Sequence, residues 1–107
     1  MPVVFIQEFV IQGGDTSTTN YDAVKNELGA DQAPEGLLIH TAGFDHDAGV
    51  FRILDVWETR EHADRFMSER LNPIVERMAA AAQAAGDTSF TPPSREGWYD
   101  LHDVLSG

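Results

Sequence analysis

The segment from Phe51 to Glu61 constrains the fold of this chain more than any other. It begins as a run typical of a β-strand and passes without a loop into a helical stretch, whose start is marked by the favourable N-cap residue Thr59. Asp55 and Trp57 are two residues apart on that strand, so their side chains point to the same face. A face that packs under helices is normally apolar. Asp55 breaks this pattern, which makes this face the first place to look for a functional site.

The remaining sequence supplies three more strands and the helices between them. Their order along the chain is strand, helix, strand, strand, helix, strand, which is the split βαβ pattern of an α+β fold. We therefore predict one domain over residues 1–107, with an antiparallel four-stranded sheet in the order 4-1-3-2 and helices on one face. The predicted strands are Val3 to Ile11, Gly36 to Phe44, Val50 to Glu58 and Trp98 to Leu105, and the predicted helices are about Asn20 to Leu28, Arg60 to Leu71 and Pro73 to Ala85.

Cap residues refine the boundaries of the helices. Thr19 and Asp22 have the spacing of a capping box at the start of the first helix, which Gly29 should end. Asn72 is a good N-cap and Pro73 suits a first helical position. The long helical stretch should therefore break and restart at these two residues.

Both faces of the first strand are apolar, because Val3, Phe5 and Phe9 alternate with Val4 and Ile6. Helices can cover only one of these faces. The other face needs a second cover, and the simplest is the same face of another copy related by two-fold symmetry. We therefore expect a homodimer formed through the helix-free faces of the two sheets.

The balance of charges excludes several classes of partner. The formal net charge is −11, from 18 acidic and 7 basic residues. Such a field repels nucleic-acid phosphates and anionic membranes, so we expect neither as a partner. The chain has no cysteine, which excludes disulfides, thiolate nucleophiles and cysteine zinc sites. No apolar run approaches a membrane span and the segment from Met1 to Phe5 does not read as a signal peptide, so a cytoplasmic protein is expected.

The turn from Asp45 to Gly49 sets the register between the second and third strands. A two-residue or a four-residue turn places His40 directly opposite Asp55, whereas a three-residue turn with Gly49 in a bulge would move that pairing. The first register is favoured because it groups aromatic residues on one face. Asp45, His46 and Asp47 are ionisable, but three adjacent residues in a turn rarely converge on one ion. No metal site is therefore expected here. The favoured register also pairs Phe44 with Phe51 and Leu38 with Trp57.

A histidine and an aspartate paired on a covered face have a chemical use. The carboxylate orients the imidazole and raises its basicity, which makes His40 with Asp55 a candidate general base. A hydrogen-bonded structural pair at the edge of a pocket is the alternative. Glu8 and His102 also fall near the middle of predicted strands, and they would join this pair if their side chains share its face. The other interpretation of Glu8 is a carboxylate that faces solvent at the rim of the dimer.

Aromatic residues could form the walls of a pocket for a flat apolar ligand. Trp57 and Trp98 are the best candidates, although core packing is the commoner role of such residues. His62 lies one helical turn before Phe66, so both could face the sheet, while a solvated first helical turn also explains this histidine. The predicted pocket residues are Trp57, Phe66, His62, Trp98, His102, Glu8, Phe44 and Phe51.

The strand end Asp55-x-Trp57, the capping threonine after it and the order of the strands resemble the antibiotic biosynthesis monooxygenase-like proteins. These are small proteins of the dimeric α/β-barrel superfamily with a ferredoxin-like βαββαβ fold. The resemblance extends from about Val3 to Val104. Many members carry a histidine in the helix where this chain has Phe66. The resemblance therefore implies no haem ligation through that position, and no cofactor is expected.

Related barrels include cofactor-independent quinone-forming oxygenases, haem-degrading oxygenases and polyketide cyclases. The resemblance implies a monooxygenase in which His40 with Asp55 deprotonates an electron-rich phenol, aromatic or polyketide-like, and the substrate itself reacts with dioxygen. A cyclase or isomerase with the same base and a non-catalytic ligand-binding dimer are the alternatives. An open pocket that contains both residues would favour catalysis, and a core filled by Phe44, Phe51 and Phe66 would favour binding alone.

Overall fold

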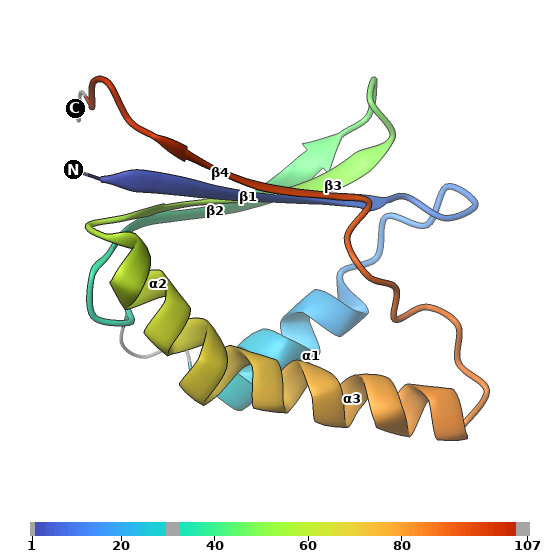
Figure 1. Ribbon diagram of the computed structural model, residues 1–107. Coiled ribbons are helices and arrows are strands. Elements are labelled where there is room, and N and C mark those ends of the chain that lie inside the picture. The colour runs from blue at the N-terminus through green and yellow to red at the C-terminus, as the bar shows by residue number, and fades with distance from the viewer. Residues whose placement is uncertain (1, 30–32, 105–107) are drawn as a thin grey trace.

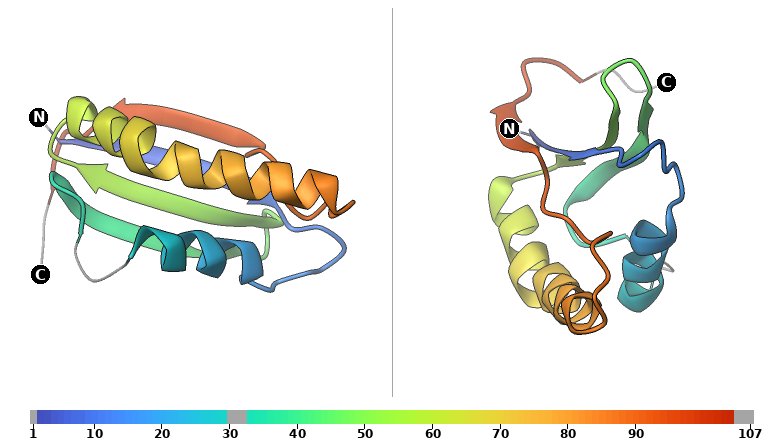
Figure 2. Two further views of the ribbon diagram at one scale, coloured as in Figure 1. Left: turned by 90° about the horizontal axis from the view of Figure 1, so that it is seen from below. Right: turned by 90° about the vertical axis from the view of Figure 1, so that its right-hand side faces the viewer.

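The computed structural model describes residues 2–29 and 33–104, and its elements follow the predicted order (Figure 1). All helices lie on one side of the sheet (Figures 1 and 2). No helix within the described ranges is long and apolar enough to cross a membrane. The strands are β1 (Val3–Val10), β2 (Leu37–Asp45), β3 (Val50–Trp57) and β4 (Arg95–Asp100), and the helices are α1 (Thr19–Leu28), α2 (Arg60–Phe66), a π-helical segment (Met67–Leu71) and α3 (Asn72–Ala84).

The four strands form one antiparallel sheet in the order β2-β3-β1-β4. This is the predicted order 4-1-3-2 read from the opposite edge, so the prediction of a ferredoxin-like α+β fold is confirmed. The strands β1 and β3 are central, and α1 lies over the β2 side of the sheet with α3 beside it (Figure 2). This arrangement leaves one face of the sheet under helices and the other face without them.

Strand β4 begins and ends earlier than predicted. The prediction of a strand from Trp98 to Leu105 was wrong, and the last of these residues lies outside the described part of the chain. The partner strand sets the limit, because β1 starts at Val3, which pairs with Asp100; one step further, Leu101 N–H still donates to the carbonyl of Pro2 at 3.1 Å. His102 therefore lies beyond the sheet, in an exposed bend rather than in the middle of a strand.

The predicted break between the two long helices does not occur. Asn72 has helical dihedral angles of −59° and −42°, and its N–H donates to the carbonyl of Met67 in the wider π pattern. That wider turn lies directly before Pro73, whose ring would otherwise meet the carbonyl one helical turn back. The chain thus runs from α2 to α3 without an interruption, and the predicted N-cap at Asn72 was wrong.

The two predicted helix caps behave differently. Thr59 caps α2, since its Oγ1 accepts the backbone N–H of His62 at 3.2 Å. The predicted capping box of α1 does not form, because Thr18 precedes the helix and no side chain caps its first turn. The Thr18 hydroxyl instead donates to Asp22 Oδ2 at 2.8 Å. Gly29 ends α1 as predicted, with a φ of 74° that favours glycine.

The buried core lies at one end of the helix-covered face. Val3, Phe5, Trp57 and Ala63 form it, and Trp57 is only 1% exposed. By contrast, α1 and α3, which the structure describes in full, contain no buried residue. The end of the face that these two helices cover is therefore more open than the end that α2 covers. The partly buried residues Leu37, Phe66, Met67 and Trp98 pack around the core.

The helix-free face of the sheet is also apolar. Val4 and Val56 are buried on it. Val10, Ile39 and Tyr99 share this face and are 57%, 44% and 50% exposed. Apolar side chains that remain exposed on a sheet face are typical of a surface that a partner covers.

Candidate functional site

A row of four residues crosses the helix-covered face of the sheet. Backbone pairing places His40 opposite Asp55, Asp55 opposite Phe5, and Phe5 opposite Trp98. Phe5 belongs to the core that packs under the helices, which fixes the face for the whole row. The aspartate that breaks the apolar pattern of β3 therefore points toward the helices.

The predicted hairpin register is confirmed at the site and wrong at the far end of the strands. His40 lies opposite Asp55, and a four-residue turn joins β2 to β3. The predicted pairing of Leu38 with Trp57 was wrong, because Leu37 takes that place. A bulge at this end of β2 inserts one extra residue, so the register shifts only beyond His40.

His40 and Asp55 are in direct hydrogen-bond contact. His40 Nδ1 and Asp55 Oδ1 are 2.5 Å apart, and the side chains are 37% and 16% exposed. An ionised carboxylate can only accept a hydrogen bond, so Nδ1 carries the hydrogen in this contact. In the neutral imidazole this leaves the lone pair on Nε2, on the side away from Asp55. A group placed at Nε2 can therefore hand its proton to His40.

Tyr21 of α1 occupies that position. Its hydroxyl oxygen is 2.6 Å from His40 Nε2. The two rings are stacked, with centroids 6.2 Å apart and planes inclined by 4°. The helix and the two strands thus contribute one residue each to a hydrogen-bonded chain, Tyr21–His40–Asp55. Sequence reasoning missed Tyr21, although its place on the apolar face of a helix that must cover the sheet was a usable signal.

The surroundings keep Tyr21 in its neutral form. Burial raises the pKa of its hydroxyl, and the negative charges of Asp55 and Asp22 raise it further. A neutral hydroxyl is a donor, and the Nε2 of neutral His40 is an acceptor. The donors of the chain therefore run in one direction, from Tyr21 to His40 and from His40 to Asp55.

Two phenylalanines line the same region. Phe51 meets the edge of the Tyr21 ring at 5.4 Å, and Phe44 lies 4.9 Å from Phe51. His46 of the turn stacks against Phe44 at 6.0 Å. Phe44 and Phe51 therefore form an aromatic surface beside the Tyr21–His40–Asp55 chain.

Other predicted pocket residues lie in the buried core or pack against it, and among them Trp98 stands at the β4 side of the row that contains His40 and Asp55. Trp57 packs against Phe66 at 5.6 Å, and Trp98 packs against Phe5 at 4.4 Å. The guanidinium of Arg60 lies 4.5 Å from the Trp98 ring. Among the described residues, Trp57 Nε1 is the one buried side-chain polar atom without a hydrogen-bond partner. A buried donor normally finds a partner, so this nitrogen is an unused hydrogen-bonding group next to Phe66.

Glu8 lies on the opposite face of the sheet from His40 and Asp55. It pairs across the strands with Arg52, whose Nε donates to Glu8 Oε2 at 2.6 Å. Arg52 also donates to Asp45 Oδ2 at 3.0 Å, and Arg95 lies 3.6 Å from Glu8. Glu8 is 8% exposed, so the solvent-facing position predicted for it is not the one it has. Its charge is instead held in an ion-pair network on the helix-free face.

Hydrogen bonds within that network favour the charged forms of Asp45 and Arg52. Hydrogen bonds from Ala48 and Arg52 lower the pKa of Asp45, and the pKa of Arg52 is raised by hydrogen bonding to Glu8 and then to Asp45. An arginine does not lose its proton in proteins. The network therefore holds the hairpin to the sheet and offers no base.

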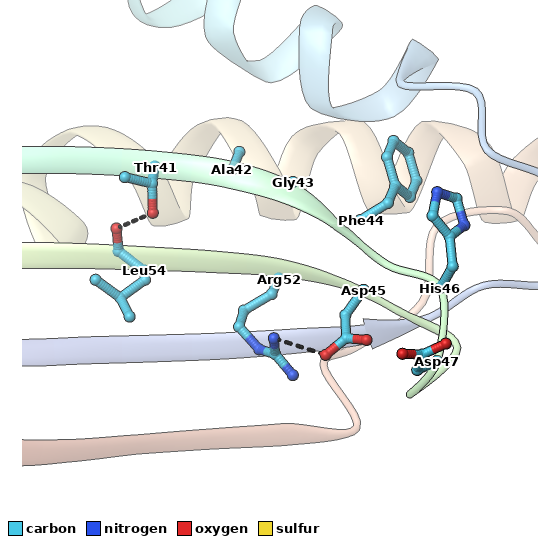
Figure 3. A pocket seen from close by; sticks show the side chains of 9 residues that line it. All are labelled: Thr41, Ala42, Gly43, Phe44, Asp45, His46, Asp47, Arg52 and Leu54. Carbon is cyan, nitrogen blue, oxygen red and sulfur yellow. Dashed lines mark hydrogen bonds and ion pairs between the residues drawn. The ribbon is translucent and has the colours of Figure 1, made fainter.

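One cavity lies over this network. Its volume is about 680 Å³, and Figure 3 shows Arg52 and Asp45 among the residues that line it. A second cavity of about 220 Å³ lies between the loop before β2 and the helical segment around Phe66. Neither of these two cavities is lined by His40 or Asp55. The lining residues of the first are Thr41, Ala42, Gly43, Phe44, Asp45, His46, Asp47, Arg52 and Leu54.

The two remaining predicted residues stand apart from His40. His62 lines the smaller cavity, with its Nδ1 2.7 Å from Thr59 Oγ1 and its Nε2 3.9 Å from Glu35. His102 lies beyond β4. Within residues 2–29 and 33–104, no three histidine or carboxylate side chains are grouped so that they could hold a metal ion.

Comparison with protein families and curated proteins gives no match, whereas comparison with solved structures does. No protein-family model matches the chain, and no curated protein matches it in sequence. Solved structures, however, match it over nearly its whole length. Rv0793 from Mycobacterium tuberculosis has a TM-score of 0.66 at 15% identity, over 99% of this chain and 100% of its own.

Two further solved structures connect this fold with oxygenases. A candidate antibiotic biosynthesis monooxygenase from Chloroflexus aurantiacus has a TM-score of 0.63 at 13% identity, over 99% of this chain and 98% of its own. SnoaB, a cofactor-independent oxygenase from Streptomyces nogalater, has a TM-score of 0.58 at 18% identity, with the same coverage. The predicted resemblance is thus confirmed at the level of the fold: this chain has the ferredoxin-like fold of the antibiotic biosynthesis monooxygenase-like proteins. Identities this low define the fold and leave the reaction to be argued from the site.

Proposed function

We propose that this protein is a cofactor-independent monooxygenase that acts on an electron-rich phenol of aromatic or polyketide-like type. The observation that carries the proposal is the Tyr21–His40–Asp55 chain, in which a phenol already lies in hydrogen-bond contact with an imidazole held by a carboxylate. A substrate phenol at the same nitrogen would be placed for deprotonation. SnoaB shares the fold and is described as a cofactor-independent oxygenase, which supports the reaction class.

The proposed reaction needs one base and dioxygen. The substrate hydroxyl gives its proton to His40 Nε2, and the Asp55 carboxylate stabilises the resulting imidazolium. The electron-rich phenolate then reduces dioxygen, and one oxygen atom adds to the ring carbon that bears the hydrogen to be replaced. The second oxygen atom leaves as water, so a phenol and dioxygen give a quinone and water. Phe44 and Phe51 would contact the flat ring beside the base.

We further propose that the protein is a homodimer formed through the helix-free sheet faces. Val10, Ile39 and Tyr99 are exposed on that face, and a face of this size buried against a second copy would exceed the roughly 1,200 Å² typical of specific interfaces. Light scattering should give twice the mass of the chain at micromolar concentration. A stable monomer under those conditions would contradict the proposal.

Oxygen uptake tests the proposed reaction. A dihydroxynaphthalene added to the protein should consume one dioxygen per quinone formed, and His40→Gln should reduce the rate by about 10²–10⁴-fold. His46→Gln is the matched control, because His46 is exposed in the hairpin turn and does not contact Asp55. Equal rates in the wild type and His40→Gln would rule out His40 as the base.

A second candidate is a non-catalytic protein that binds aromatic ligands. It is favoured by the fact that neither of the two described cavities is lined by His40 or Asp55. In this case the hydrogen-bonded chain would join α1 to the sheet and perform no chemistry. Saturable binding of the same dihydroxynaphthalene without any oxygen uptake would establish this alternative.

A further inference from the structure

Tyr21 presents a phenol to the base from within the protein. Its hydroxyl is 2.6 Å from His40 Nε2, the same nitrogen that a phenolic ligand would need. The lone pair on that nitrogen accepts one hydrogen bond, so Tyr21 and a ligand cannot both occupy it. Any ligand that reaches His40 must therefore displace the Tyr21 hydroxyl.

The attachment of α1 allows such a displacement. The helix is tied to the neighbouring helical run by Arg77 to Glu27 at 2.9 Å, and by Arg70 to the carbonyl of Leu28 at 2.7 Å. Its aromatic contacts with the sheet run through the Tyr21 ring, which lies against His40 and Phe51. The Tyr21 side chain can thus leave His40 while the other links of α1 remain in place.

We propose that Tyr21 is a gate: an internal phenol that occupies the base until an incoming phenol displaces it, so that the site selects ligands by competition with its own tyrosine. The inference rests on the proposed function for the class of ligand. It adds a residue that decides which phenols bind.

The competition favours phenols that are more acidic than tyrosine, which among the proposed electron-rich substrates means phenols on fused aromatic rings such as a dihydroxynaphthalene. A phenol like the tyrosine side chain only exchanges one neutral hydrogen bond for another, and so gains little. The environment raises the pKa of Tyr21, and the same burial and the same charge of Asp55 act on any phenol in its place. A more acidic phenol can still transfer its proton to His40, and the resulting charge-assisted pair is about twice as strong as a neutral hydrogen bond. Para-nitrophenol should therefore bind more tightly than para-cresol, which has the phenol of tyrosine itself.

Binding of these two phenols to the full-length protein tests the gate. In Tyr21→Phe no hydroxyl has to be displaced, so affinity for both probes should rise roughly twofold to tenfold, which corresponds to one neutral hydrogen bond. The matched control is Tyr99→Phe, which removes the hydroxyl of a tyrosine on the opposite face, in the proposed dimer interface, and should bind both probes like the wild type. In the wild type, saturating para-nitrophenol should also shift the NMR signals of the Tyr21 ring, a result that does not depend on how well any variant folds.

The outcomes separate the gate from the base. If binding is lost in His40→Gln but is unchanged or weaker in Tyr21→Phe, Tyr21 is no gate and the base stands. An equal gain in Tyr99→Phe, or Tyr21 signals that do not move, also overturns the gate. If para-nitrophenol binds without any dependence on His40, the proposed base fails together with the gate. If para-nitrophenol does not bind while a dihydroxynaphthalene is still oxidised, the gate alone fails.

Discussion

The two faces of the sheet each carry a chain of polar side chains, and the two chains differ in what they can do. On the helix side, Asp55 of β3 holds His40, which meets Tyr21. On the other side, three residues further back on the same strand, Arg52 lies between Glu8 and Asp45. The first chain consists of groups that exchange protons. The second contains an arginine that keeps its proton.

The difference shows why a polar residue within an apolar strand does not identify a site by itself. Glu8 and Asp55 both interrupt an apolar alternation near the middle of a central strand. Glu8 is held by Arg52, so its burial is explained by ion pairing. Asp55 is held by a histidine whose second nitrogen points toward a helix-borne phenol. The partner decides the chemistry, and the partner is visible only once the strands are in register.

The largest expected effect is on activity at the helix-side chain. Asp55→Asn should leave the fold intact and lower the rate of phenol oxidation by about 10²–10⁴-fold, because an amide no longer stabilises the imidazolium. The thermal midpoint should move only a few degrees. Rates and melting curves of the purified variant check this. A large loss of stability with unchanged activity would make the pair structural.

Replacing a carboxylate by an amide on the other face of the sheet should lower stability and leave activity unchanged. Glu8→Gln removes one carboxylate from Arg52 and should lower the free energy of unfolding by about 1.5–3 kcal/mol, as expected for a buried hydrogen bond to a charged group. The rate per folded molecule should stay at the wild-type value. Urea denaturation and oxygen uptake measured on one preparation test both parts. If Glu8→Gln abolished turnover without destabilising the protein, the contrast between the faces would be wrong.

A smaller effect concerns the alkaline limit of stability. The pKa of Tyr21 is raised in the folded protein, so the folded state holds this proton more tightly than the unfolded state does. The associated stability is fully present below the unfolded value of about 10 and is lost as the pH rises through the folded value. Tyr21→Phe should lack this part of the alkaline decline, and Tyr99→Phe should retain it. Unfolding titrations at increasing pH provide the comparison.

The smallest expected effect is the change in the absorption spectrum when hemin is added to the protein. Phe66 packs against Trp57 at the helix position where the family resemblance implied a histidine, and the neighbouring His62 is already hydrogen-bonded to Thr59. Titration with hemin should therefore give no sharp one-to-one spectral transition. Such a transition, if it were lost in His62→Ala, would show that this histidine serves as an axial ligand.

The sequence predicted those parts of the fold and site that depend on local rules. The grouping of aromatic residues on one face favoured a turn length that places His40 opposite Asp55, because a hairpin links register to turn length. The face of the sheet on which Glu8 lies could not be predicted in this way. Whether its side chain shares a face with Asp55 depends on the pairing between β1 and β3, which are far apart in the chain. The end of β4 depended in the same way on where β1 begins.

Tyr21 escaped prediction for a related reason. Its position on the apolar side of α1 indicated that it faces the sheet, but not which strand residue it meets. That contact depends on how α1 crosses β2, which is set by tertiary packing rather than by any spacing in the sequence. The π turn before Pro73 was hidden as well, because asparagine followed by proline is also typical of a new helix start.

The central claim is that Asp55 holds His40 so that an unprotonated Nε2 faces the helix side. Nitrogen NMR of the His40 ring at mildly alkaline pH tests it most directly. We predict that the hydrogen resides on Nδ1 and that Nε2 shows the shift of a hydrogen-bonded acceptor in the wild type, and that this preference is lost in Asp55→Asn. A wild-type ring that carries its hydrogen on Nε2, or the same tautomer in both proteins, would contradict the account.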